Sequence, residues 1–153
     1  MWKSNAKMAA IPVLMALSAL QAGAANVREC TDFEANVQSL AEPWERNTKV
    51  FLNGAVRIAM VDTGGEPVCC STHLLVLAEN KSDEHEGRLC GIISNQGNAG
   101  FEWIEFAKIQ ASYNPASGLN LVVPVKFYVD GLKQKFGSFR VNVNTQRGVI
   151  TAK

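Results

Sequence analysis

The reactive side chains of this chain gather in one stretch, Val68–Leu77, which holds two of the four cysteines and one of the two histidines. Thiolate and imidazole groups are good ligands for zinc and copper(I). One interpretation is therefore a metal-linked enzyme that uses Cys69, Cys70 and His73. The chain has no Cys-x-x-Cys pair, however, which is the spacing typical of zinc sites. We therefore expect no bound metal and no cofactor.

A disulfide framework is the interpretation that we favour, because the four cysteines are an even number and we expect export to an oxidising compartment. Neighbouring side chains on a strand point to opposite faces, so Cys69 and Cys70 should each bond a distant cysteine. Two pairings remain open: Cys30–Cys69 with Cys70–Cys90, or Cys30–Cys70 with Cys69–Cys90. Each bond should stabilise the fold by roughly 2–4 kcal/mol.

Two histidines and two tryptophans are the other candidate binding residues. His73 lies in an apolar segment that predicts a strand, where a histidine packed on a sheet face is the common outcome. His85 lies in the charged loop 79–87, which has almost no apolar residues. Trp44 and Trp103 could form a platform on which a sugar stacks, although large aromatic residues more often belong to a core or its cover.

Catalytic signatures are missing from the sequence. It contains no Gly-x-Ser-x-Gly, no His-Glu-x-x-His and no glycine loop for phosphate. We therefore predict no catalytic residue and expect a protein that is not an enzyme.

The N-terminal 25 residues have the three-part layout of a secretory signal peptide. Lys3 and Lys7 give a positive start, Met8 to Leu20 form an apolar run, and small residues around Ala25 offer a cleavage site. The apolar run is short for a bilayer-spanning helix, so we expect no membrane span. The expected product is a single domain, residues 26–153, that is periplasmic or secreted.

The charge balance limits the partners. Loss of Lys3 and Lys7 with the signal peptide would leave 13 basic and 14 acidic side chains, a net charge of −1. A chain without a basic excess is a poor candidate for binding nucleic acid. We expect no nucleic-acid partner.

The apolar pattern predicts a mainly β (α+β) fold, with one N-terminal helix packed on an antiparallel β-meander that closes toward a small barrel or sandwich. The capping-box pattern at Thr31 and Glu34, with Pro43 after it, predicts the helix at 32–42. The segment 68–78, apolar on both alternating faces, should be the central strand. Further strands are expected at 49–61, 88–93, 106–113, 119–129, 139–143 and 149–151, with a turn or short helix at 101–105.

Three functions remain open from the sequence. The preferred one is a small exported, disulfide-stabilised, non-catalytic binding domain, such as a periplasmic inhibitor or an immunity-type protein. Its partner would be an envelope or secreted protein, bound through loop 79–87 or loop 94–102. The second is a carrier of a small ligand or lipid in a β-barrel cavity. The third is the metal-linked enzyme.

Overall fold

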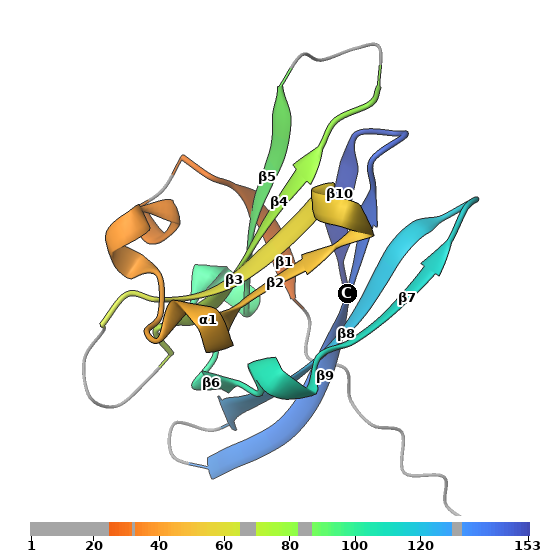
Figure 1. Ribbon diagram of the computed structural model, residues 1–153. Helices are drawn as coiled ribbons and strands as arrows, with labels where there is room; N and C mark the ends of the chain where they lie inside the picture. Colours follow the sequence, from red (N-terminus) through yellow and green to blue (C-terminus); the bar gives the residue numbers. More distant parts are fainter. Residues whose placement is uncertain (1–24, 32, 65–69, 83–86, 130–132) are drawn as a thin grey trace, which may run out of the picture.

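Two antiparallel sheets form the fold (Figure 1). The computed structural model describes residues 25–31, 33–64, 70–82, 87–129 and 133–153. Sheet A has the strand order β1-β5-β4-β3-β2, and sheet B has the order β10-β9-β8-β6, with β7 also paired to β8. Sheet A comprises β1 Asn26–Glu29, β2 Thr48–Phe51, β3 Val56–Asp62, β4 Thr72–Glu79 and β5 Arg88–Ser94. Sheet B comprises β6 Trp103–Ile104, β7 Gln110–Asn114, β8 Gly118–Val129, β9 Lys133–Asn144 and β10 Val149–Ala152.

This architecture confirms a mainly β chain and corrects the idea of barrel closure. The two sheets are separate ladders over the described residues, so the arrangement is an open sandwich and not a closed barrel. The successive pairings of β7 with β8, β8 with β9 and β9 with β10 confirm the C-terminal meander. Within the described ranges, no helix has the length and apolar character needed to cross a bilayer.

Strand β4 is the centre of sheet A and is buried on both faces, as its sequence predicts. Leu74 and Val76 belong to the main core, whereas Leu75 belongs to a second apolar cluster on the opposite face. A central strand with cover on both sides needs apolar residues at odd and even positions alike. The run Leu74–Leu77 supplies them.

The main core fills the space between the sheets. Phe101 and Phe139 stack there, with ring centroids 4.9 Å apart and an interplanar angle of 8°. Burial of each large aliphatic or aromatic side chain stabilises the fold by about 1.5–3 kcal/mol. Other fully buried members include Leu74, Val76, Ile93, Ile104, Leu121 and Val123.

The single helix expected at 32–42 is wrong. The described part of this segment forms two 3-10 turns, Phe33–Ala35 and Val37–Ser39, and the α-helical turn α1 comes only after it, at Trp44–Asn47. Asn36 accounts for the break, because its side-chain oxygen accepts a hydrogen bond from the backbone N–H of Gln38 at 3.1 Å. Asparagine competes in this way with regular helical bonding.

The strand expected at 49–61 is also wrong, because it is a hairpin. Strand β2 ends at Phe51 and β3 begins at Val56. Leu52, Asn53 and Gly54 between them all have positive φ angles, of 51°, 54° and 98°. The chain therefore reverses at Leu52–Gly54, where the glycine adopts its positive φ without steric cost.

The segment 101–113 also contains a turn where a continuous strand was expected. Its first part forms the short strand β6, and a 3-10 turn, Phe106–Lys108, follows where a strand was expected. Strand β7 starts only at Gln110. Phe106 and Ile109 are buried in the main core with two exposed residues between them, a spacing of three that fits a 3-10 turn rather than one continuous strand.

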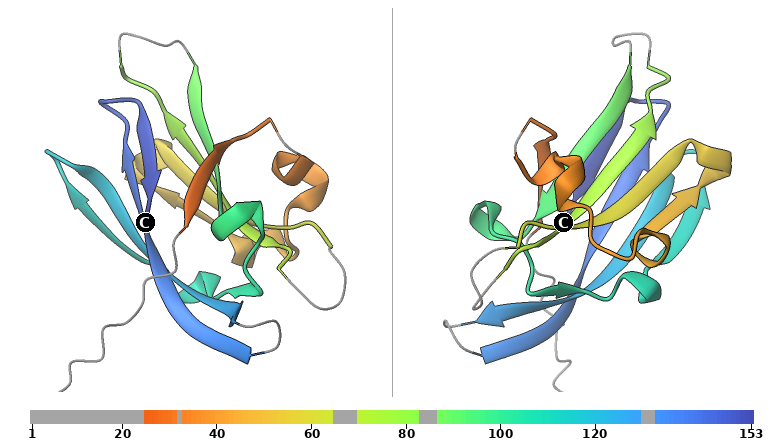
Figure 2. Two further views of the ribbon diagram at one scale, coloured as in Figure 1. Left: turned by 180° about the vertical axis from the view of Figure 1, so that it is seen from behind. Right: turned by 60° about the vertical axis from the view of Figure 1, so that its left-hand side comes forward.

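The outer faces of the two sheets differ. Residues 33–41, called the covering segment below, lie across the outer face of sheet A (Figure 2). Ala35 and Leu40 of this segment pack against the second apolar cluster, and Leu40 forms a β-bridge with Val61. Over the outer face of sheet B no described element is packed, which leaves its polar side chains exposed.

Candidate functional site

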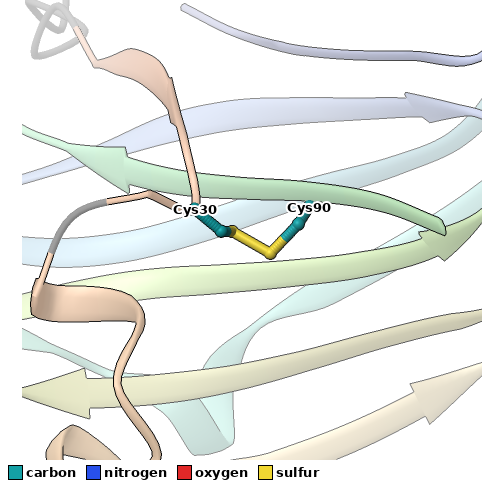
Figure 3. The surroundings of a disulfide bond; sticks show 2 residues. All are labelled: Cys30 and Cys90. Carbon is teal, nitrogen blue, oxygen red and sulfur yellow. A yellow bond between two sulfur atoms is a disulfide. The ribbon is translucent and has the colours of Figure 1, made fainter.

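One disulfide, Cys30–Cys90, joins the end of β1 to strand β5 (Figure 3). Both expected pairings are therefore wrong, since each placed these two cysteines in different bonds. Cys70 is also disulfide-bonded, and Cys69 lies outside the described residues. The expectation failed because Cys70 precedes β4 and has a φ angle of 75°, so strand alternation does not apply to it.

These bonds bear on the metal-linked enzyme. A cysteine in a disulfide carries no thiolate, so Cys70, Cys30 and Cys90 are unavailable as metal ligands in this oxidised chain. Among the described residues, no group of three or more His, Cys, Asp or Glu side chains is placed to hold a metal ion.

His73 belongs to a buried polar cluster beneath the covering segment. Its Nδ1 lies 2.8 Å from Oγ of Ser94, which also accepts a hydrogen bond from Nη2 of Arg28 at 3.1 Å. The same Arg28 nitrogen lies 2.9 Å from Oε1 of Glu34 in an ion pair. Strands β1, β4 and β5 and the covering segment each supply one member, so the cluster fastens the cover to the sheet.

The charges in this cluster influence one another. Burial lowers the pKa of His73, the Arg28 charge acts in the same direction, and the Glu34 and Asp62 carboxylates oppose them. For Glu34, burial alone would raise the pKa, but the hydrogen bond from Arg28 and the positive charge of Arg28 hold it below its ordinary value. The folded protein therefore favours a neutral histidine beside an ionised carboxylate.

Histidine and serine can act as a general base and a nucleophile, but His73 and Ser94 are not accessible to a substrate. Ser94 is 0% exposed and His73 is 3% exposed. A reacting group must reach both atoms for acyl transfer. The cluster is therefore interpreted as a structural network.

The remaining predicted site residues are dispersed. Trp44 and Trp103 are 51% and 44% exposed, and one lies in α1 while the other lies in β6. The only ring–ring contact among the described residues joins Phe101 and Phe139, so a shared tryptophan platform is not formed. His85 lies outside the described residues.

The sequence reasoning missed a polar surface on the outer face of sheet B. Residues directly opposite each other in an antiparallel ladder lie on the same face. Four strands contribute one such row: Ser112 of β7 pairs with Asn120 of β8, which pairs with Asn142 of β9, which pairs with Thr151 of β10. The next row contains Arg140, whose backbone exchanges hydrogen bonds with that of Lys153.

A groove of about 810 Å³ follows these rows. Its charged lining residues are Arg140, Arg147 and Lys153, and no acidic residue is among the lining, all of which lies in the described ranges. The other polar lining residues are the amides Asn120, Asn142 and Asn144 and the hydroxyl side chains Ser112, Ser117 and Thr151. The groove therefore offers positive charge together with neutral hydrogen-bonding groups.

The same face continues to an aromatic end. Trp103 of β6 and Phe136 of β9 both pair with Lys126 of β8, so the three side chains share one row of the outer face. Phe136 is 68% exposed, and Nζ of Lys126 lies 5.2 Å from the centroid of its ring. Row by row, an extended surface runs from the basic groove to these aromatic rings. We call this surface, made of the groove and the Trp103–Lys126–Phe136 row, the sheet B face.

A smaller groove of about 250 Å³ lies on the outer face of sheet A, beside the covering segment. It is mostly apolar, and its lining includes Leu40, Val50, Leu75 and Leu77, with Lys49 and Arg57 as the basic residues. Lys49 donates to the carbonyl oxygen of Phe106 at 2.9 Å, which fixes its ammonium away from a ligand role.

A signal for the sheet B face exists in the sequence. Polar residues alternate with the apolar ones in both long strands, as in Asn120, Arg140 and Asn142. Only the register shows that they align, and register depends on the β8–β9 and β9–β10 connections.

Comparisons with protein-family models, curated proteins and solved structures give no significant match. The geometry of the chain itself is therefore the basis for assigning a function.

Proposed function

We propose that the protein is a small exported, non-catalytic binding domain, and that the sheet B face binds a negatively charged partner. The observation that carries this proposal is the lining of the groove. Arg140, Arg147 and Lys153 face one concavity without an acidic residue among its lining. A concave surface with charge of one sign attracts ligands of the opposite sign.

The rigidity of the face supports binding. Asn142 donates its side-chain amide to Oδ1 of Asn120 at 2.9 Å and to the carbonyl oxygen of Ser117 at 2.9 Å. These bonds hold the amides in the centre of the groove in one orientation. A ligand that meets pre-oriented groups loses less free energy to the ordering of side chains.

The alternatives have weaker support. A lipid carrier needs an internal cavity, whereas the space between the sheets is filled by fully buried side chains such as Phe101 and Phe139. The enzyme hypothesis needs accessible thiolates or an accessible His73, and the described residues supply neither. Loop 94–102, the other candidate for binding a protein, has no comparable concentration of charged residues.

Binding of sodium polyglutamate and polygalacturonate, measured by isothermal titration calorimetry, tests the proposal. Arg140→Glu should weaken binding by about tenfold or more, because a paired charge becomes a repelling one. Arg57→Glu is the matched control, since it makes the same change of charge at an exposed site on sheet A. The proposal is wrong if neither polymer binds the wild type, or if both variants weaken binding equally.

A further inference from the structure

We infer that the ligand of the sheet B face is an acidic polysaccharide, an inference that rests on the proposed function. Three kinds of groups follow one another along β8 and β9: the oriented amides of Asn120 and Asn142, then the guanidinium of Arg140, then the exposed ring of Phe136 beside Lys126. A carboxylated sugar polymer presents the matching groups in one repeating unit, namely an anion, hydroxyls and the apolar face of a ring.

The basic and amide groups account for the first two matches. Arginine binds a carboxylate through parallel N–H donors, and Arg140 is exposed within the groove. The row Ser112–Asn120–Asn142–Thr151 lies beside it and offers hydroxyl and amide groups. Sugar hydroxyls can both donate to and accept from these groups.

The aromatic row accounts for the third match. Phe136 and Trp103 are exposed, although large aromatic side chains are normally buried. They flank Lys126, so an anion between the two rings would meet a positive charge. Phe136 and Asn142 are six residues apart on β9, which is roughly 20 Å along a strand. The surface therefore suits an extended ligand rather than a small molecule.

The order of these groups distinguishes a polysaccharide from an acidic protein. Protein interfaces place their large apolar residues at the centre and polar residues at the rim. The sheet B face has amides and basic groups across its groove and aromatic rings at one end only. One carboxylate, that of Glu102, lies near the aromatic end, where its Oε1 accepts a hydrogen bond from Gln134.

The test uses four probes with the oxidised full domain, at one salt concentration. Polygalacturonate carries both sugars and charge, its fully methyl-esterified form carries the sugars without charge, polyglutamate carries charge without sugars, and oligothymidylate represents a nucleic acid. The inference predicts that polygalacturonate binds about tenfold more tightly than each of the other three.

Variants separate stacking from charge. Phe136→Ala and Trp103→Ala should each weaken polygalacturonate binding about threefold to tenfold and leave polyglutamate binding unchanged. Tyr113→Ala is the matched control, because Tyr113 is 55% exposed but pairs with the core residue Leu119 and so does not belong to the sheet B face. Equal binding of polygalacturonate and polyglutamate, without an effect of the aromatic variants, would overturn the polysaccharide and leave the anion-binding proposal intact. Tightest binding of oligothymidylate would also overturn the polysaccharide, and no binding of any probe would overturn both proposals.

Discussion

Asn142 on β9 donates its side-chain amide to Oδ1 of Asn120 on β8, at 2.9 Å. The two residues are directly opposite each other in the ladder, at the centre of the four-strand polar row. Asn142 also donates to the carbonyl oxygens of Ser117 and Leu119, whereas the bond that the side-chain amide of Asn120 donates to the carbonyl oxygen of Gly118 is long, at 3.5 Å. Asn142 is therefore the residue that orders this part of the sheet B face.

Replacement of the two asparagines should have unequal effects on stability. Asn142→Ala removes the amide group that donates to two carbonyl oxygens and one amide oxygen. We therefore expect a loss of about 1–2 kcal/mol in the free energy of unfolding. Asn120→Ala should cost about 1 kcal/mol or less. Urea unfolding of both variants measures the difference. A cost for Asn120→Ala that equals or exceeds that of Asn142→Ala would show that Asn142 does not order the row.

The bond between Cys30 and Cys90 closes a loop across a sequence separation of 60 residues. The double variant Cys30→Ala, Cys90→Ala should lose up to about 4 kcal/mol, because the unfolded chain regains the entropy that the bond removes. Guanidinium unfolding under non-reducing conditions measures this loss and leaves Cys70 oxidised. A loss below about 1 kcal/mol would mean that the link between β1 and β5 contributes little.

A peptide map without reduction should find the Cys30 and Cys90 peptides joined. Cys70 is disulfide-bonded as well, and Cys30 and Cys90 bond each other. We therefore predict that no peptide carrying Cys70 is joined to the Cys30 or the Cys90 peptide. A peptide that joins Cys70 to Cys30 or Cys90 contradicts this pairing.

Acid should weaken the fold through the cluster beneath the covering segment. The pKa of His73 is lowered from an ordinary value of 6.5, so the unfolded chain takes up a proton first as the pH falls below that value. The pKa of Glu34 is lowered from 4.5, so its contribution is present above that pH and is lost as the pH falls through the lower folded value. Both groups therefore lower the free energy of unfolding as the pH falls.

Urea unfolding of the wild type and of His73→Gln, at about pH 7.5 and about pH 5.5, separates the histidine from the carboxylate. Glutamine can still bond Ser94 but does not titrate in this range. The wild type should lose more stability between the two pH values than the variant does. Equal losses would assign the pH dependence to other groups.

Much of the fold follows from local pattern, and most of the candidate site does not. The alternation of apolar and polar residues predicts β8 correctly, because every second side chain of that strand is buried. The unbroken apolar run predicts β4 correctly, because that strand is buried on both faces. The hairpin at Leu52–Gly54 is hidden, since the pattern of alternation continues across the turn. Net charge likewise conceals a basic groove, because Arg140, Arg147 and Lys153 meet only through the register of β9 and β10.

The central claim is that the sheet B face is the binding surface, and an NMR titration of the isotopically labelled protein with short polygalacturonate oligomers tests it most directly. Backbone amide shifts should concentrate in β8, β9 and β10 around Asn120, Arg140 and Thr151, and reach Phe136 at the aromatic end. Shifts near Val50 and Leu77, in the groove on sheet A, should be absent. Shifts confined to sheet A, or none at saturating oligomer, would contradict the account.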